Sequence, residues 1–316
     1  MNILSEYRPK IKLPFFAAGV FALTFIAILL RTLNLFFFYD IEIGYFSSGA
    51  ALPVVMNVFA VIAIFGIAAA SFFVSKETYA ATGCEKNLLV KISSAICVLG
   101  FLFPIYIVVK NVLSIPALTL PTHTLIFLVV FFIAAVYFAT NLTSRSYKYH
   151  AILAISVILS AAYFLANSYF DLYVPMNAPN KVLLHLACIS VMIFMSCEAR
   201  CMINEAKKRF YVCALSLAVF LSGFSSIPAV ITALSNKLSY NYFVFDCVIL
   251  TVFLYLSARL ISLVITKERV TEEISDEATS NISDSADEST DCNIVTDDDT
   301  DSAPEASDNT TQMNDQ

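Results

Sequence analysis

The sequence predicts an all-α, polytopic membrane protein with about eight transmembrane helices in one bundle and a disordered C-terminal tail. Three observations predict this fold class. The 316 residues are 59% hydrophobic and 14% charged, with a mean hydropathy of +0.76, whereas a soluble domain carries nearer a quarter charged residues. The apolar residues gather in stretches of about 20, the length that crosses a bilayer's hydrocarbon layer. The chain after residue 269 has no basic residue.

These stretches divide the chain into three regions. We expect a basic N-terminal arm over residues 1–13, a membrane domain over 14–265, and an acidic tail rich in Ser and Thr over 266–316. The expected spans are residues 14–38, 52–74, 90–109, 122–141, 150–170, 182–202, 210–234 and 243–265.

The first stretch also resembles a secretory signal peptide, because Arg8, Lys10 and Lys12 precede it. No small-residue cleavage pattern follows, so we expect it to be retained as the first span.

Basic residues predict the orientation, because cytoplasmic loops hold the excess of Lys and Arg. The N-terminal arm, the even-numbered loops and the segment after the last span carry 14 of them, and the opposite side carries 3. We therefore expect a multi-pass protein of the cell membrane with both termini in the cytoplasm.

Ionisable residues within the spans are the first candidates for a functional site, because a charge in the bilayer costs several kcal/mol by insertion scales. One hypothesis pairs Arg31 with an acidic residue of the bundle, Asp246 or Asp171. The alternative is that Arg31 extends to the membrane surface. Near the other membrane face, Glu198 and Arg200 are expected to form a charge network with Arg259. The candidates within spans are Arg31, Asp171, His185, Asp246 and Arg259.

A second group lies at the expected outer mouth: Asp40, Glu42 and His123. Together with His185 these side chains would suit a divalent metal or a proton. The alternative is that both histidines are simply hydrated at the interface. Because no ligand spacing of the His-x3-His kind is present, we assign no metal and no cofactor.

A helix break is a third candidate, at Ser225, Ser226 and Pro228. Proline removes a backbone hydrogen bond, and such breaks line transporter sites. The alternative is an ordinary kink, with the hydroxyls bonded to their own helix.

Catalytic motifs with known chemistry are absent from the sequence: there is no His-Glu-x-x-His, Gly-x-Ser-x-Gly or phosphate-binding glycine loop. We therefore expect no enzymatic activity. An intramembrane enzyme would need two or more polar residues of the spans within hydrogen-bond reach of each other.

The tail differs from the rest of the chain in charge. Residues 1–269 carry +9, whereas residues 270–316 carry −15, with 14 Ser or Thr and no aromatic residue. Such a segment is expected to be disordered. A basic cytoplasmic protein would suit its charge, the protein's own basic loop is a second candidate, and a purely solubilising role is a third.

We therefore expect a non-enzymatic interaction or regulatory component of the membrane, with lipid as a partner and no nucleic acid. The alternative is a small-solute or ion transporter. It would need a polar path between the spans, formed by Asn57, Asn167, His185, Asp246 and residues 225–228.

Overall fold

The computed structural model describes residues 11–40, 44–47, 49–74, 87–113, 122–143, 149–170, 175, 177–203, 208–235 and 243–284. Contacts divide the chain into two units, Met1–Val270 and Thr271–Gln316. The first unit is the membrane domain, and the description below concerns it.

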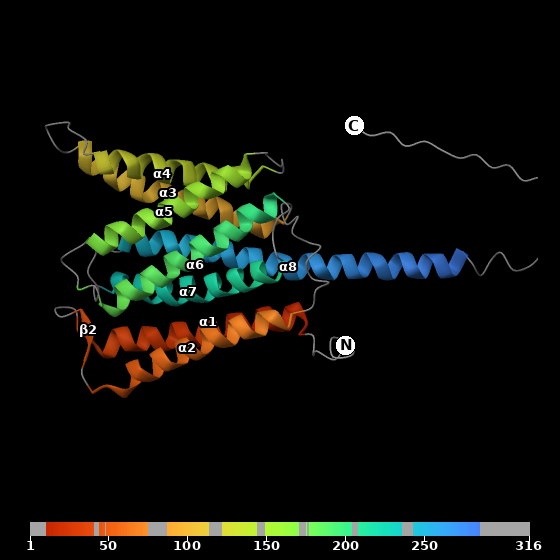
Figure 1. Ribbon diagram of the computed structural model, residues 1–316, viewed down its shortest axis with the longest axis horizontal. Coiled ribbons are helices and arrows are strands. Elements are labelled where there is room, and N and C mark those ends of the chain that lie inside the picture. Colours follow the sequence, from red (N-terminus) through yellow and green to blue (C-terminus); the bar gives the residue numbers. More distant parts are fainter. Residues whose placement is uncertain are drawn as a thin grey trace, which may run out of the picture. The chain divides into compact units, whose positions relative to one another are not determined.

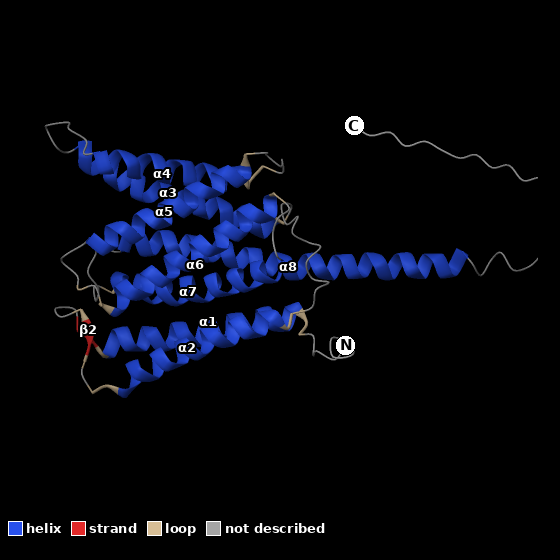
Figure 2. Ribbon diagram, viewed as in Figure 1, coloured by secondary structure: helices blue, strands red, loops and turns tan. Residues whose placement is uncertain are grey.

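The described residues of the membrane domain form eight helices, and each is long and apolar enough to cross a bilayer. The protein is therefore a multi-pass, all-α membrane protein, as the sequence predicts (Figures 1 and 2). The helices are α1 (Leu13–Phe37), α2 (Ala51–Phe72), α3 (Leu88–Leu113), α4 (Thr122–Thr140), α5 (His150–Phe170), α6 (Pro179–Met202), α7 (Lys208–Leu234) and α8 (Phe243–Asp284).

Two short strands join α1 to α2: β1 (Tyr39–Asp40) and β2 (Tyr45–Phe46). They pair antiparallel, with Tyr39 opposite Phe46. Gly44 in the turn has φ of 75°, a left-handed conformation that glycine adopts without steric cost. The sequence did not predict this hairpin, because two-residue strands leave no periodic pattern.

Helix α7 is central in the bundle. In its apolar stretch 72% of the residues are buried, against 28% in α2 and α3. It contacts α1, α2 and α6. Its Gly223 lies so close to Phe253 of α8 and Thr24 of α1 that a Cβ atom would clash, an approach that small residues permit in membrane bundles. The α1–α2 and α3–α4 hairpins lie on either side of this centre (Figure 1).

Helix α8 connects the remaining helices. The Cys97 thiol of α3 donates to the Thr251 carbonyl of α8 at 3.1 Å, and Phe164 of α5 packs edge-on against Phe245 of α8, 4.3 Å between ring centroids. Phe138 of α4 also packs edge-on against Tyr255 of α8, with 5.1 Å between ring centroids. The described part of the bundle thus has one continuous apolar core.

The end of α8 differs from the sequence prediction. The expected last span ends at residue 265, whereas α8 ends at Asp284. Residues 266–284 contain no Pro and no Gly, and a polar segment that continues a formed helix avoids the costly nucleation step. The remaining residues, 285–316, lie outside the described residues.

Candidate functional site

Arg31 binds the backbone of another helix. It lies on α1, is 1% exposed, and donates from Nη1 to the carbonyls of Phe224 and Ser225 on α7, at 2.6 and 2.8 Å. Its Nη2 donates to Oδ1 of Asn180 on α6, at 2.8 Å. One buried side chain therefore holds three helices together.

Pro228 explains why the Phe224 carbonyl accepts a side-chain donor. In an α-helix the carbonyl of residue 224 would accept from the N–H of residue 228, and proline has no N–H. The helix nevertheless runs through Pro228 without interruption. Arg31 supplies the missing donor to Phe224, and its guanidinium also lies 5.5 Å from the centre of the Phe224 ring.

The contacts of Arg31 differ from a pairing with Asp246 and from an extension to the membrane surface, whereas a pairing with Asp171 stays a prediction. Asp246 is buried and contributes an electrostatic attraction to Arg31, but among the described residues the two form no ion pair. Arg31 does not reach the membrane surface either, because it is buried between helices. Asp171, the other proposed partner, lies outside the described residues.

Asn180 and Tyr39 complete this site, which we call the Arg31 cluster: Arg31, Tyr39, Asn180, Ser225, Asp246 and the Phe224 carbonyl. Tyr39 lies near Arg31 and Asn180, and burial raises the pKa of its phenol above the ordinary value. Within this cluster, three of the buried side-chain atoms have no hydrogen-bond partner among the described residues: Arg31 Nε, Asn180 Nδ2 and Ser225 Oγ. All three groups are donors.

A second buried site lies near the opposite membrane face. Arg259 of α8 forms an ion pair with Glu198 of α6, and the two side chains are 6% and 4% exposed. The Tyr211 hydroxyl donates to Oε2 of Glu198 at 2.6 Å, and Arg259 Nε donates to the Tyr255 hydroxyl at 3.1 Å. We call Glu198, Arg259, Tyr211 and Tyr255 the Glu198 cluster. Arg200, which we expected in this network, is exposed.

The two clusters are separated by apolar packing. Asp246 and Arg259 are thirteen residues apart on α8, which is about 20 Å along the helix. Between the clusters, Ser216 and Ser222 of α7 are buried, and both donate to carbonyls of their own helix. These hydroxyls therefore offer no free polar group to a solute.

Of the other sequence candidates, Asp40 acts electrostatically on Tyr39 of the Arg31 cluster. His185 is within hydrogen-bond distance of the Ser168 hydroxyl, at 3.1 Å. His123 and Asp40 are exposed, and Glu42 lies outside the described residues. No group of three His, Cys, Asp or Glu side chains that would hold a metal occurs in the part of the chain that the structure describes.

The residues proposed for a polar path are also separated. Asn57 and Asn167 are exposed on the outside of their helices, whereas Asp246, Ser225 and Ser226 are buried. Ser226 donates to the Ser222 carbonyl at 2.7 Å. The five positions therefore do not line one common path.

Sequence reasoning missed Asn180, Tyr211 and Tyr255. The contact of Tyr255 with Arg259 could have been predicted, because Tyr255 is four residues before Arg259 and so shares its helix face. Tyr211 and Asn180 had none, since each meets its partner only through the packing of different helices.

The fold and the two buried clusters place the chain in a broad class, the multi-pass helical membrane proteins with few charged residues inside the membrane. No family model, no curated protein and no solved structure matches the chain.

Proposed function

We propose that the protein is a non-enzymatic interaction or regulatory component of the cell membrane, with both termini in the cytoplasm. One observation supports this proposal: three of the charged side chains buried in the described membrane domain, Arg31, Glu198 and Arg259, bind one another or groups of neighbouring helices. Arg31 binds α7 carbonyls and Asn180, and Glu198 binds Arg259 and Tyr211. These contacts hold helices together.

The acidic C-terminal segment then supplies the contact with a partner. Residues 270–316 carry 15 acidic residues and no basic one. Like charges of this density repel an anionic leaflet and attract a basic protein surface. The proposed partner is therefore a basic protein of the cytoplasm.

The test is affinity purification from native membranes of three chains: the full chain, a version ending at Arg269, and a full-length version with the 15 acids changed to amides. We expect a stoichiometric basic protein with the full chain alone, and its release by salt. If the amide version retains the partner, charge is not what binds it. If no partner accompanies any version, the proposal is wrong.

Orientation has its own test, with single-cysteine variants in intact cells. A membrane-impermeant maleimide is expected to label Asp40→Cys, because Asp40 is exposed in β1 between α1 and α2. The native Cys292 is expected to react only after permeabilisation. The reverse pattern would invert the proposed topology.

A small-solute transporter is the second candidate, and one observation favours it. The unpartnered donors Arg31 Nε, Asn180 Nδ2 and Ser225 Oγ are the groups that a small anion or carboxylate would bind. Uptake of chloride or acetate into proteoliposomes that Asn180→Leu abolishes would support transport. Uptake equal to that of empty liposomes would exclude these two solutes.

A further inference from the structure

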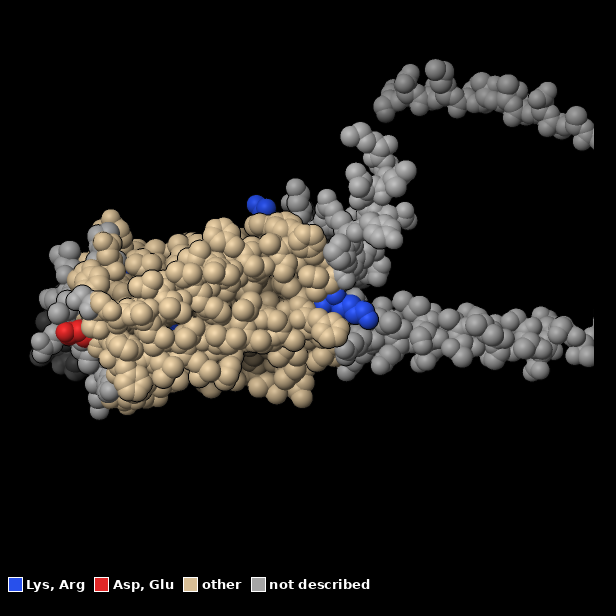
Figure 3. Space-filling model, turned by 90° about the horizontal axis from the view of Figure 1, so that it is seen from below, with Lys and Arg blue, Asp and Glu red and all other residues tan. Residues whose placement is uncertain are grey.

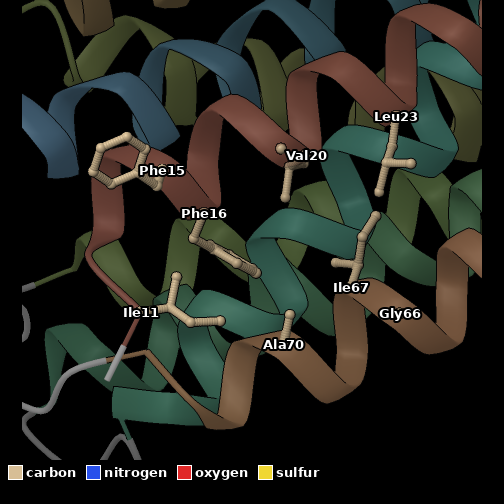
Figure 4. A pocket seen from close by; sticks show the side chains of 9 residues that line it. Ile11, Phe15, Phe16, Val20, Leu23, Gly66, Ile67 and Ala70 are labelled. Atoms are coloured by element: carbon tan, nitrogen blue, oxygen red, sulfur yellow. The ribbon is translucent and has the colours of Figure 1, made fainter. Parts of the chain in front are cut away.

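A groove between α1 and α2 opens toward the surrounding membrane near the start of α1 (Figure 4). It has a volume of about 230 Å³, and every residue that lines it is apolar. Phe16, Val20 and Ile67 form its buried floor, and Phe15, 74% exposed, stands at its edge.

Two glycines create this hollow. Gly19 is six residues after the start of α1, and Gly66 is six residues before the end of α2. Since the two helices run antiparallel, both glycines lie about 9 Å from the same ends of the hairpin. A Cβ atom on either glycine would meet nothing within 4 Å, so the missing side chains leave open space.

A basic residue lies next to the groove. The amide of Ile11 donates to the Phe73 carbonyl at 3.0 Å, which ties the chain before α1 to the end of α2. Lys12 follows, exposed, at the N-cap of α1. In the sequence, Lys10 and Arg8 precede it. The positive end of the α1 dipole adds to this charge.

We propose that the groove binds an anionic phospholipid, with one acyl chain between Gly19 and Gly66 and the phosphate at Lys12. Water has no polar partner in such a groove. Lys12 beside it favours an anionic headgroup, by about fivefold for a basic residue near the surface. This inference is independent of the proposed function.

The first experiment uses the absence of Trp from the chain. Phe15→Trp places a single fluorophore at the groove, and Phe25→Trp places one on an exposed position of α1 outside it. Both proteins are reconstituted in phosphatidylcholine with a small share of phosphatidylglycerol brominated on its acyl chains. We expect several times more quenching at position 15. Equal quenching at the two positions would overturn the proposal.

The second experiment fills the groove. Gly19→Leu and Gly66→Leu occupy the hollow. Ala18→Leu and Ala69→Leu add the same side chain at exposed positions outside the groove, one residue from Gly19 and three residues from Gly66. Native mass spectrometry then measures retained phosphatidylglycerol. We expect the glycine variants to lose the retained lipid and the alanine variants to keep it. Equal retention in all four would show that the lipid does not bind here.

Two further measurements test the contact of Lys12 with the headgroup and the occupation of the groove by a second copy of the chain. Lys12→Glu is expected to remove the preference for phosphatidylglycerol over phosphatidylcholine, and an unchanged preference would contradict the headgroup contact. If Gly19→Leu instead converts a dimer to a monomer and leaves lipid retention unchanged, a second copy of the chain occupies the groove and the proposal is wrong.

Discussion

The Arg31 cluster and the Glu198 cluster bury similar charges with different partners. Glu198 and Arg259 neutralise each other, and tyrosine hydroxyls bind both. Arg31 binds two backbone carbonyls and an amide oxygen, and the nearby Asp246 forms no ion pair with it. The first arrangement depends on opposite charge, and the second on a carbonyl that Pro228 leaves without a donor.

The two charged centres also differ in how fully their own polar atoms are hydrogen bonded. A backbone carbonyl accepts two hydrogen bonds but supplies only a partial charge. Arg31 Nε and Asn180 Nδ2 remain without acceptors, whereas neither Glu198 nor Arg259 has an unpartnered buried atom. The Arg31 cluster thus has donors that a ligand or an ordered water would bind.

The largest expected effect comes from Glu198→Gln. It leaves the buried Arg259 without a counter-charge, and breaking a buried pair in this way costs about 3 to 5 kcal/mol. Denaturation in detergent micelles, followed by circular dichroism, measures the loss. Tyr211→Phe is the control, with an expected cost of about 1 kcal/mol. A smaller cost for Glu198→Gln than for Tyr211→Phe would contradict the importance of charge here.

Arg31→Met is expected to cost about 2 kcal/mol, because three interhelical hydrogen bonds are lost and each contributes about 0.6 kcal/mol in a membrane bundle. Pro228→Ala restores an N–H for the Phe224 carbonyl. It should therefore stabilise the Arg31→Met protein more than the native one, by about 1 kcal/mol in a double-mutant cycle. Strict additivity of the two substitutions would show that Arg31 does not replace the missing donor.

Asp246→Asn sharpens the comparison, since it is the matched carboxylate-to-amide change at the Arg31 cluster. We expect a cost below about 1 kcal/mol, because the amide removes both an attraction and the desolvation cost of a buried carboxylate. The same denaturation assay applies. A cost equal to that of Glu198→Gln would mean that Arg31 depends on Asp246 as a counter-charge.

Tyr39→Phe gives the smallest expected effect, and it concerns pH. Burial raises the pKa of Tyr39 above its ordinary value near 10, so the folded state binds the phenolic proton more tightly than the unfolded state. Stability is therefore lost as the pH rises through about 10 and above. Unfolding at neutral and alkaline pH should show less alkaline loss in Tyr39→Phe than in the native chain. Equal losses would contradict the shift.

The spans were predictable because hydropathy is a local property. The expected 150–170 coincides with α5, and the expected 14–38 differs from α1 by one residue at each end. The contacts of the clusters were not predictable in the same way. Pro228 indicated which carbonyl lacks a donor, but the donor is 193 residues from that carbonyl in sequence. Only the packing of α1 against α7 brings the two together.

The distance of 193 residues in sequence between Arg31 and the Phe224 carbonyl also has a consequence for biosynthesis. At about 5 to 20 residues per second, the ribosome needs roughly 10 to 40 s to proceed from Arg31 to its acceptor on α7. Throughout this interval the nascent first helix carries a cation in or beside the bilayer without its final hydrogen bonds. Release of α1 into lipid is therefore best delayed until α6 and α7 emerge, and chains truncated before α7 are expected to be degraded.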